Sequence, residues 1–489
     1  MPTLRLFTLL TLATTAASAQ QPYRSLNVDA GKVQGEVRFH TEAVVQPMPT
    51  LGGEYGEPLA ALRDQRLDRV VIPVALGDSS HRPARERVAW AVFPDGNADA
   101  QEAASYDFRA VDAIIESATA QVTAAAVRFD VHPSAEESGA KIAETARRVA
   151  MHLNQGWAKS HGFGIREWRV CDQDRQDTQE NAVGGANSLA SETSNAIVDT
   201  LRRIDPSVSV GRCLAWSAAS PASIAPPSLG APNQAPDFYW LALPAAIADA
   251  DGPRRMAEQL RHQLDGAGSN GIELRLVSPV VRLADSVQSD SDAAVQAAKF
   301  AAALVYLQDA PVASVALDLW SEASGAREEK PRAVLRAAAQ LTATPHRLAV
   351  EGGDSIGYAV LAGRSTDRAS IQILIANHQQ DSPGSGPVHP LAELAPAAAQ
   401  PRREPASTQD GKEGYDLEAA NLPWGAGDFG VYCYRVDQEH NFELVWGGGG
   451  RGGSLRLRRR LPPGAVELVI LQQQERPVHE RLPRRRDRR

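Results

Sequence analysis

Residues 136–171 read EESGAKIAETARRVAMHLNQGWAKSHGFGIREWRVC and combine a helix signal with a strand signal. Residues 165–171 form a short run of mixed and apolar residues, as expected for a strand buried on both faces. Before this run, apolar side chains fall on one stripe of a helix: Ile142, Ala146, Val149, Ala150, Leu153 and Trp157. The stretch therefore predicts one helix followed by one buried strand.

The same alternation extends in both directions along the chain. Helical stretches are expected at residues 106–118, 136–157, 188–203, 252–264, 291–307 and 330–341, and β-rich runs at 69–76, 88–93, 123–130, 165–171, 207–214, 237–242, 272–278 and 314–320. Eight strands with intervening helices predict an α/β fold, a (β/α)8 TIM barrel, which we place at residues 56–344. An open doubly wound sheet has the same pattern. No G-x-G-x-x-G fingerprint follows a strand, which disfavours its dinucleotide-binding version.

The C-terminal part changes character, because no helical period is found after residue 344. Strands with turns are expected at residues 356–362, 371–376, 430–436, 442–446 and 465–471, and the glycines at 447–450 are interpreted as a hairpin turn. We predict a C-terminal β-sandwich domain at residues 345–478, joined by N-terminal strands from residues 20–55. Residues 378–415, rich in Pro, Ser, Ala and Gln, are interpreted as a flexible loop, and residues 479–489 as a basic disordered tail.

The N-terminus has the pattern of an export signal. Arg5 is the only charge before an apolar stretch, and Ala17-Ser18-Ala19 has the spacing that a signal peptidase reads. We therefore interpret residues 1–19 as a signal peptide and expect an exported protein, either periplasmic or secreted. No other stretch is long and apolar enough to predict a transmembrane helix.

Composition limits the class of protein. The 489 residues include 43% hydrophobic and 22% charged residues, which indicates a globular chain. The net charge of -8 argues against a nucleic-acid-binding protein. Three cysteines exclude a disulfide scaffold and leave a free thiol or an intermolecular bridge. No signature of a metal or cofactor site is found, so we predict none, and the sequence leaves the oligomeric state open.

Several segments in colinear order resemble glycoside hydrolase family 39, which includes β-xylosidases and α-L-iduronidases. Residues 93–99, FPDGNAD, resemble the family's FPDxxAD run, and residues 152–157 with 165–168 resemble its HYNxGW…IRYW. The other matching segments are residues 106–112, 205–211, 306–311, 421–425 and 434–437. The resemblance covers most of residues 60–472.

This resemblance implies a retaining glycosidase, in which one carboxylic acid protonates the leaving oxygen and a second carboxylate attacks the sugar. The acid/base glutamate of the family aligns with Gln173, and its nucleophile aligns with Ser278. A glutamine amide has no proton to donate at a useful pKa, and general acid catalysis contributes about 10²–10⁴ in rate. A serine hydroxyl without an adjacent base is a weak nucleophile. The resemblance therefore implies a barrel without the family's double displacement.

Other positions implied to line a sugar site are only partly kept. The family's sugar-contacting histidine aligns with Ala242. The candidate substrate-binding residues that remain share a place at or near the predicted strand ends: Arg128, Trp168, Asp172, Asp174, Asp237, Asp318 and Trp320. Tryptophan among them is able to stack on a pyranose ring.

Three functional hypotheses remain open. The first is a pseudo-glycosidase that binds carbohydrate, xyloside-like or another glycan, or a partner at the barrel mouth. The second is an active hydrolase with a rebuilt site, in which Asp172 acts with Asp237 or Asp318. Such a pair would hydrolyse with inversion if its two carboxyl groups were about 6.5–9.5 Å apart. The third is a structural or assembly protein of an envelope polysaccharide system.

Overall fold

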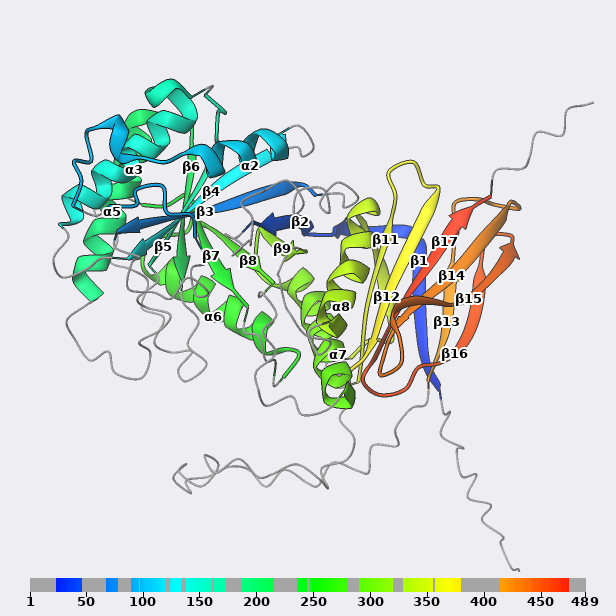
Figure 1. The fold of residues 1–489 in the computed structure, drawn as a ribbon. Coiled ribbons are helices and arrows are strands. Elements are labelled where there is room, and N and C mark those ends of the chain that lie inside the picture. The colour runs from blue at the N-terminus through cyan, green and yellow to red at the C-terminus, as the bar shows by residue number, and fades with distance from the viewer. Residues whose placement is uncertain are drawn as a thin grey trace, which may run out of the picture.

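The computed structural model places a barrel beside a β-sandwich (Figure 1). It describes residues 23–45, 67–77, 89–95, 97–119, 124–132, 138–160, 162–172, 187–214, 235–243, 247, 249–278, 290–319, 329–354, 357–379 and 414–474. No helix in these ranges is long and apolar enough to cross a membrane. The predicted signal peptide and basic tail, and nearly all of the predicted loop, lie outside the described residues.

Eight parallel strands close the barrel in sequence order, which confirms the predicted fold class. The first strand pairs with both the second and the eighth, so that the sheet has no edge. The strands are β2 (Phe39–Val44), β3 (Arg69–Gly77), β4 (Ala124–His132), β5 (Glu167–Asp172), β6 (Ser209–Leu214), β7 (Phe238–Ala242), β8 (Glu273–Val277) and β9 (Ser314–Asp318).

The helices of the barrel cover the strands from outside (Figure 1). They are α2 (Arg109–Thr119), α3 (Gly139–Gln155), α5 (Asn187–Ile204), α6 (Gly252–Gly266), α7 (Asp290–Tyr306) and α8 (Glu329–Gln340). Helix α3 begins where the Ser138 side chain accepts the Lys141 N–H, and it ends at Gly156, whose φ of 74° is left-handed. The predicted apolar stripe of this helix is buried, apart from Trp157, which lies in the short 3-10 helix that follows.

Two of the motifs that carry the family resemblance meet in the scaffold. His152 on α3 contacts Asp112 on α2 through Nε2 at 2.9 Å and the Trp157 carbonyl through Nδ1 at 2.8 Å. Its ring is stacked on Phe108 with the centroids 3.6 Å apart. The His152 side chain of this motif therefore holds two helices together and does not line the interior of the barrel.

The first barrel strand differs from our prediction. Residues 20–55 were expected to join the sandwich, but β2 lies in the barrel, and residues 88–93 do not form the expected barrel strand. Strand β2 pairs with β3 only as far as Val71, so the residues of β3 after Val71 have no β2 residue beside them. Trp90 fills this place with a single bridge to Val74, in which the Trp90 N–H donates to Pro73 O at 2.8 Å.

Nine strands form the second sheet, which confirms the β-sandwich of the predicted fold class. The sheet order is β15-β14-β17-β12-β11-β10-β1-β13-β16, so the N-terminal strand lies between strands from the far end of the chain. The strands are β1 (Tyr23–Glu36), β10 (His346–Glu351), β11 (Tyr358–Arg364), β12 (Ser370–Asn377), β13 (Gly414–Ala420), β14 (Asp428–Val436), β15 (Asn441–Arg451), β16 (Leu455–Arg460) and β17 (Ala465–Gln473).

The four glycines at 447–450 lie inside β15, so the predicted hairpin turn is wrong. A Cβ on Gly450 would lie 2.3 Å from the Phe429 ring, and one on Gly448 would lie 2.6 Å from the Trp446 ring. The glycines therefore leave space for aromatic rings that lie across the strand.

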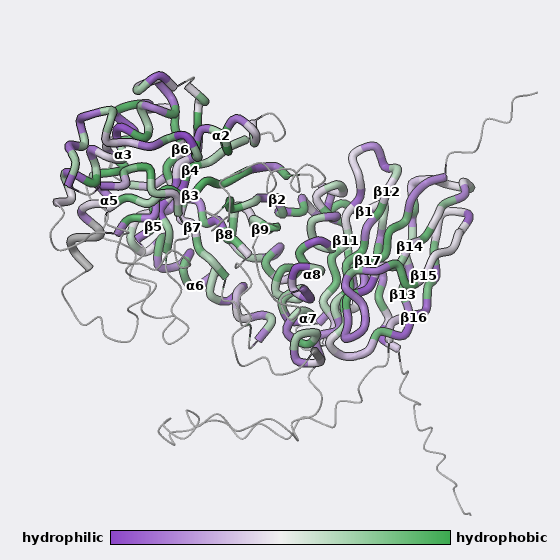
Figure 2. Tube along the Cα trace, viewed as in Figure 1, coloured by the Kyte–Doolittle hydropathy of each residue, from purple (hydrophilic) through white to green (hydrophobic). Residues whose placement is uncertain are grey.

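A common apolar core joins the two domains. Helices α7 and α8 bury residues such as Ala301 and Val334 against the sheet residues Leu361, Leu374 and Leu468. A second core lies inside the sandwich, between its two layers. Figure 2 shows hydrophobic segments, in green, both in the helices α7 and α8 and in the strands β11 and β12.

Candidate functional site

The interior of the barrel follows from the alternation of side chains along each strand. On β4, Val127 and Phe129 belong to the apolar core between strands and helices, so Arg128 and Asp130 point into the barrel. The carboxyl ends of the strands form the barrel mouth, where functional sites of this fold class lie. The inward-facing residues near that end therefore form the candidate site.

Five charged residues fill the part of the barrel interior that is farther from the mouth. We call them the ionic floor: Glu42, Arg69, Glu167, Arg169 and Arg275. The Arg169 guanidinium lies 3.0 Å from Glu42 and 2.8 Å from Glu167. Arg69 and Arg275 approach Glu167 at 3.1 Å and 3.0 Å. Each buried charge is thus paired, which is the condition for burying it at tolerable cost.

The ionic floor shifts the pKa values of its members. Burial raises the pKa of the Glu42 carboxyl, but the charge and hydrogen bonds of Arg169, together with His40 at 3.8 Å, outweigh burial and lower it to about 2. Burial also raises the pKa of Glu167, and three arginines lower it overall. Both carboxyl groups are therefore ionised at neutral pH and are unsuited to donate a proton.

Aromatic rings lie above the floor. The Arg169 guanidinium is 3.5 Å from the centroid of the Trp240 ring, and that of Arg275 is 3.9 Å from the Phe238 ring. Gly211 gives room for Phe238, since a Cβ there would lie 2.0 Å from the ring. Side chains consequently fill the barrel interior up to the level of Trp240.

Arg128 and Asp130 form a polar pair near the mouth. The guanidinium donates from Nε and Nη2 to the two carboxylate oxygens, both at 2.8 Å. The Asp130 side chain is fully buried, whereas Arg128 keeps 17% of its side-chain exposure. This bidentate geometry fixes both side chains and leaves the edge of the guanidinium accessible.

A disulfide joins the adjacent strands β5 and β6 at the same level. Cys171 and Cys213 are bonded, with their Cα atoms 4.6 Å apart. In register, Cys171 lies beside Asp130, and Cys213 lies beside Trp240. Cys433 in the sandwich is the free, buried cysteine.

Ser278 directly follows β8, the seventh barrel strand, as the aligned nucleophile position requires. Val277 belongs to an interior cluster, so Ser278 is turned away from the barrel axis. Its side chain is 1% exposed, and its Oγ accepts the Asp318 N–H at 2.8 Å. Asp318 ends β9, where Val44 N–H lies 3.4 Å from its carboxylate. The Ser278 hydroxyl is thus bound between two strands.

Asp172 and Trp168 lie on the outer side of β5. The Asp172 carboxylate accepts the Ser194 hydroxyl of α5 and lies 3.5 Å from the Arg212 guanidinium. Trp168 is fully buried in the core between the strands and helices. The structure therefore does not bring these two predicted site residues to the inside of the barrel.

Two other predicted residues lie at opposite ends of β7. Asp237 precedes the strand, at the end away from the mouth, and accepts the Val210 N–H at 2.7 Å and Arg202 at 2.9 Å. Ala242 ends the strand beside Val277, at the mouth, and is exposed. Of the predicted set, Arg128, Ala242 and Asp318 are at the mouth. Gln173, Asp174 and Trp320 lie outside the described residues.

Sequence reasoning missed Asp130, the Cys171–Cys213 pair and Trp240 as interior groups. Asp130 ends a predicted strand two residues after Arg128, and that spacing was an available signal. In the described ranges, no group of three or more His, Cys, Asp or Glu side chains is placed to hold a metal ion.

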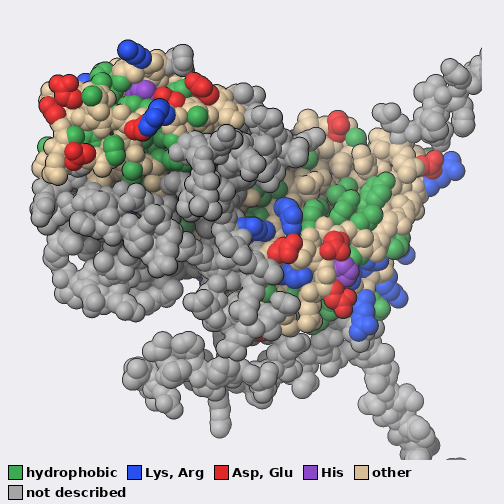
Figure 3. All heavy atoms as spheres, in the orientation of Figure 1, with side chains coloured by type: hydrophobic (Ala, Val, Ile, Leu, Met, Phe, Trp, Pro, Cys, Tyr) green, Lys and Arg blue, Asp and Glu red, His purple; other side chains and the backbone are tan. Residues whose placement is uncertain are grey.

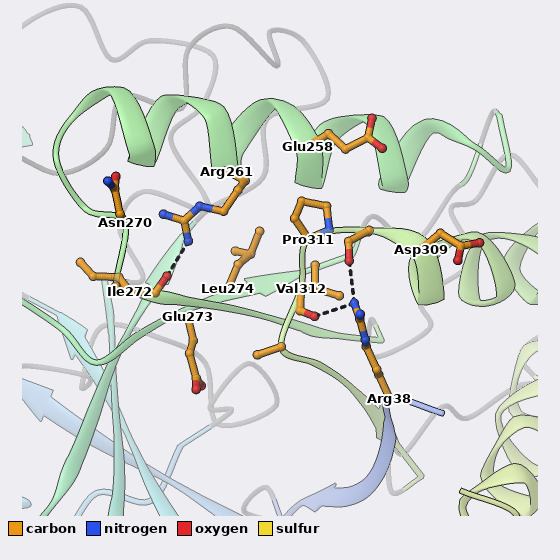
Figure 4. A pocket seen from close by; sticks show the side chains of 13 residues that line it. Arg38, Glu258, Arg261, Asn270, Ile272, Glu273, Leu274, Asp309, Pro311 and Val312 are labelled. Atoms are coloured by element: carbon orange, nitrogen blue, oxygen red, sulfur yellow. Dashed lines mark hydrogen bonds between the residues drawn. The ribbon is translucent and has the colours of Figure 1, made fainter. Parts of the chain in front are cut away.

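A cavity of about 700 Å³ lies at the other end of the barrel (Figure 4). Its guanidinium groups are occupied by backbone carbonyls: Arg38 donates to Ala310 and Val312, and Arg261 donates to Ser269 and Ile272. It lies at the amino ends of β8 and β9, away from the mouth, and we do not assign a site to it.

Solved structures share the fold. A glucosidase from Croceicoccus marinus superposes with a TM-score of 0.70 at 23% identity, covering 93% of this chain and 100% of that one. A monomeric β-xylosidase from Caulobacter crescentus gives 0.60 at 14% identity, covering 92% and 99%. A family 39 glycoside hydrolase from Xanthomonas axonopodis pv. citri gives 0.58 at 12% identity, covering 94% and 99%. No protein-family model and no curated protein sequence matches the chain.

Proposed function

We propose that this chain is an exported, glycosidase-like protein that lacks the double displacement of retaining glycosidases and binds carbohydrate at the barrel mouth. The chain has a fold found in solved glycosidases, and Ser278 directly follows its seventh barrel strand. In the sequence, Gln173 and Ser278 stand where the resemblance implies glutamates.

The single observation that carries the proposal is the environment of Ser278. A nucleophile needs a base nearby and access to the substrate. Ser278 is buried, is turned away from the barrel axis, and its hydroxyl accepts the backbone N–H of Asp318. Such a hydroxyl supports strand pairing and is poorly placed to attack a sugar.

The geometry gives the alternative hydrolase little support. Its key residue, Asp172, contacts Ser194 and Arg212 outside the barrel, and Asp237 lies at the opposite end of the barrel. Two carboxyl groups acting across a glycosidic bond must both face the same space. Among the described residues at the mouth, the Asp130 carboxylate is held by Arg128, and the Asp318 carboxylate lies 3.4 Å from the Val44 N–H.

Carbohydrate binding is supported by the kind of groups at the mouth. Arg128 keeps 17% of its side chain exposed and offers N–H donors at the mouth. Trp240, which is 5% exposed, lies in the same interior, with β5 and β6 between its strand and β4. Similar folds occur in proteins described as a glucosidase and a β-xylosidase. The ligand class that we propose is therefore a neutral glycan or glycoside.

Export is supported by two independent features. Residues 1–19 carry the signal-peptide pattern, and Cys171 and Cys213 form a disulfide. Disulfides persist in the periplasm and outside the cell and are rare in the cytosol. The proposed location is thus periplasmic or secreted.

The test combines turnover and binding on the same purified protein. We expect no hydrolysis of aryl xylosides, arabinosides, glucosides or iduronides above that of a Ser278→Ala control, even with leaving groups that need no acid. We expect isothermal titration with xylo- and gluco-oligosaccharides to detect binding that Arg128→Ala weakens. Turnover that Asp172→Ala abolishes would refute the proposal in favour of the rebuilt hydrolase. Absence of both turnover and binding would refute the carbohydrate-binding part.

A further inference from the structure

Strand β15 forms one end of the nine-stranded sheet. It runs for eleven residues, Asn441–Arg451, and pairs with β14 on one side only. In the described part of the chain no strand pairs with its other side. A strand of this length at a sheet edge presents a row of backbone donors and acceptors to which a further strand can bind. Figure 1 shows β15 in the part of the sandwich that lies away from the barrel strands.

The two edges of this sheet differ in protection. The other edge strand, β16, carries exposed arginines such as Arg456 and Arg458, which are paired with Glu418 and Asp416 of β13. Charged side chains on an edge strand discourage pairing with other chains. In β15 no charged residue lies between Glu443 and Arg451, a stretch that includes Leu444, which is 54% exposed. Only β15 therefore lacks charges along its centre.

The two halves of β15 differ in side-chain size. Its first half holds large side chains, including Leu444 and Trp446, and its second half holds the four glycines at 447–450. Antiparallel pairing of two identical strands about Gly447 would place the large side chains of each copy opposite the glycines of the other, where they would meet the rings of Phe429 and Trp446 that already lie over Gly450 and Gly448. This arrangement has two-fold symmetry, as an interface between two copies of one chain commonly does.

The charges at the ends of the strand fit the same arrangement. Glu443 lies near the beginning of β15 and is exposed, and Arg451 ends it with 69% of its side chain exposed. Among the carboxylates that the structure describes, Arg451 forms an ion pair with Asp428, at 3.5 Å. Antiparallel pairing brings the acidic end of each strand next to the basic end of the other, whereas parallel pairing would bring like charges together.

We propose that β15 of one copy pairs antiparallel with β15 of a second copy, which joins the two sandwiches into one continuous sheet. Hydrophobic side chains also gather on the visible face of the sandwich, near β14 and β17 (Figure 3). A single strand pair buries less surface than a stable obligate dimer needs. The dimer is therefore reversible, with a dissociation constant in about the micromolar range.

The test is sedimentation velocity of the purified full chain from 1 to about 200 µM, a range that brackets this affinity. We expect a concentration-dependent dimer that Glu443→Lys and Arg451→Glu each weaken by about tenfold or more, because each places two pairs of like charges together. Mixing the two single variants in equal amounts restores opposite charges at both pairs, so a heterodimer is expected. The control is Arg456→Glu on β16, which should leave the dimer unchanged.

Three outcomes would overturn the proposal: a monomer throughout this range, a dimer that neither β15 variant weakens, and two weakened variants whose mixture does not associate. The mixture separates a loss of pairing from a loss of folding, because an unfolded variant cannot be rescued by its partner. Circular dichroism of each variant provides the second check of the fold.

Discussion

The guanidinium of Arg169 lies 3.5 Å from the centroid of the Trp240 ring and at the same time forms ion pairs with Glu42 and Glu167. One side chain thus connects the ionic floor of the barrel with the lowest ring of the candidate site. Because all three charged groups are buried, a change in the floor is expected to reach Trp240 through this contact.

Glu42→Gln is expected to lower the free energy of unfolding by about 3–5 kcal/mol at pH 7, because Arg169 then loses a buried partner. The pKa of Glu42 is lowered from 4.5 to about 2, so its stabilisation is complete above pH 4.5 and is lost as the pH falls towards 2. That loss is on the order of 3 kcal/mol. Urea titrations of both proteins at pH 7 and 3 measure the two effects.

The control for this prediction is Glu418→Gln in the sandwich. Glu418 and Arg456 form an ion pair with side chains 43% and 78% exposed, so its removal should change stability by no more than about 0.5 kcal/mol. An acid-induced loss in Glu42→Gln as large as in the unmodified chain would contradict our assignment of the pH dependence to Glu42.

The disulfide is expected to lower the number of free thiols and to stabilise the protein. Denatured protein without reductant should show one thiol per chain, from Cys433, and three after reduction. The bond closes a loop with a sequence separation of 42, for which chain entropy gives about 3–4 kcal/mol. Urea unfolding with and without a reductant, beside a Cys171→Ala/Cys213→Ala variant, measures this stabilisation. Three thiols before reduction would show that the bond does not form.

Asp172→Asn is expected to change stability rather than ligand binding. The carboxylate is 9% exposed and contacts Ser194 and Arg212 outside the barrel, so its loss should cost about 1–3 kcal/mol. Titration calorimetry should give the same glycan affinity as for the unmodified chain. A variant of full stability that no longer binds glycan would instead place Asp172 in the binding site.

Glu467 is a buried ionic link within the sandwich. It accepts hydrogen bonds from Arg435 of β14 at 2.6 Å, from Arg459 of β16 at 3.3 Å, and from the Tyr415 hydroxyl of β13. These strands come from both ends of the sheet order, so the carboxylate ties the two layers together. Glu467→Gln is expected to destabilise the protein by about 3–5 kcal/mol in urea titrations.

The alkylation rate of Cys433 measures how often the surroundings of Glu467 unfold. Burial, and next the charge of Glu467, raise the pKa of its thiol to about 12, so little thiolate is present at pH 8. Alkylation by iodoacetamide in native buffer should therefore be slow and should follow unfolding. Glu467→Gln should accelerate it by about tenfold for every 1.4 kcal/mol of stability lost. Rapid labelling of the unmodified chain would contradict the burial of this thiol.

Much of the fold could be predicted, because most strands and helices bury apolar faces with a clear period. Strand β2 could not, since His40, Thr41 and Glu42 interrupt its apolar pattern. Glu42 is buried only because Arg169, 127 residues further along the chain, pairs with it. A buried parallel strand is usually recognised by a continuous run of apolar residues, and a buried glutamate held by a distant arginine interrupts that run.

The candidate site was predicted only in part, for a related reason. Arg128 was predicted from its place near a strand end, but Trp168 and Asp172 face outward, because the interior side of β5 belongs to Arg169 and Cys171. The side that a residue faces depends on register, which the strands fix only when they pair. The disulfide likewise depends on the alignment of two parallel strands and had no local signal.

The position of β1 in the sheet has a consequence for how the chain reaches its folded state. β1 pairs with β10 and β13, which lie more than 300 residues further along the chain, and the barrel closes only when β2 meets β9. Both closures join segments that are far apart in sequence, and such contacts slow folding. An emerging chain can complete neither domain early, so its first strands stay unpaired until synthesis is well advanced. A polypeptide of this topology therefore remains loosely structured until most of its residues have been synthesised, and it is exposed to proteolysis and aggregation during that interval.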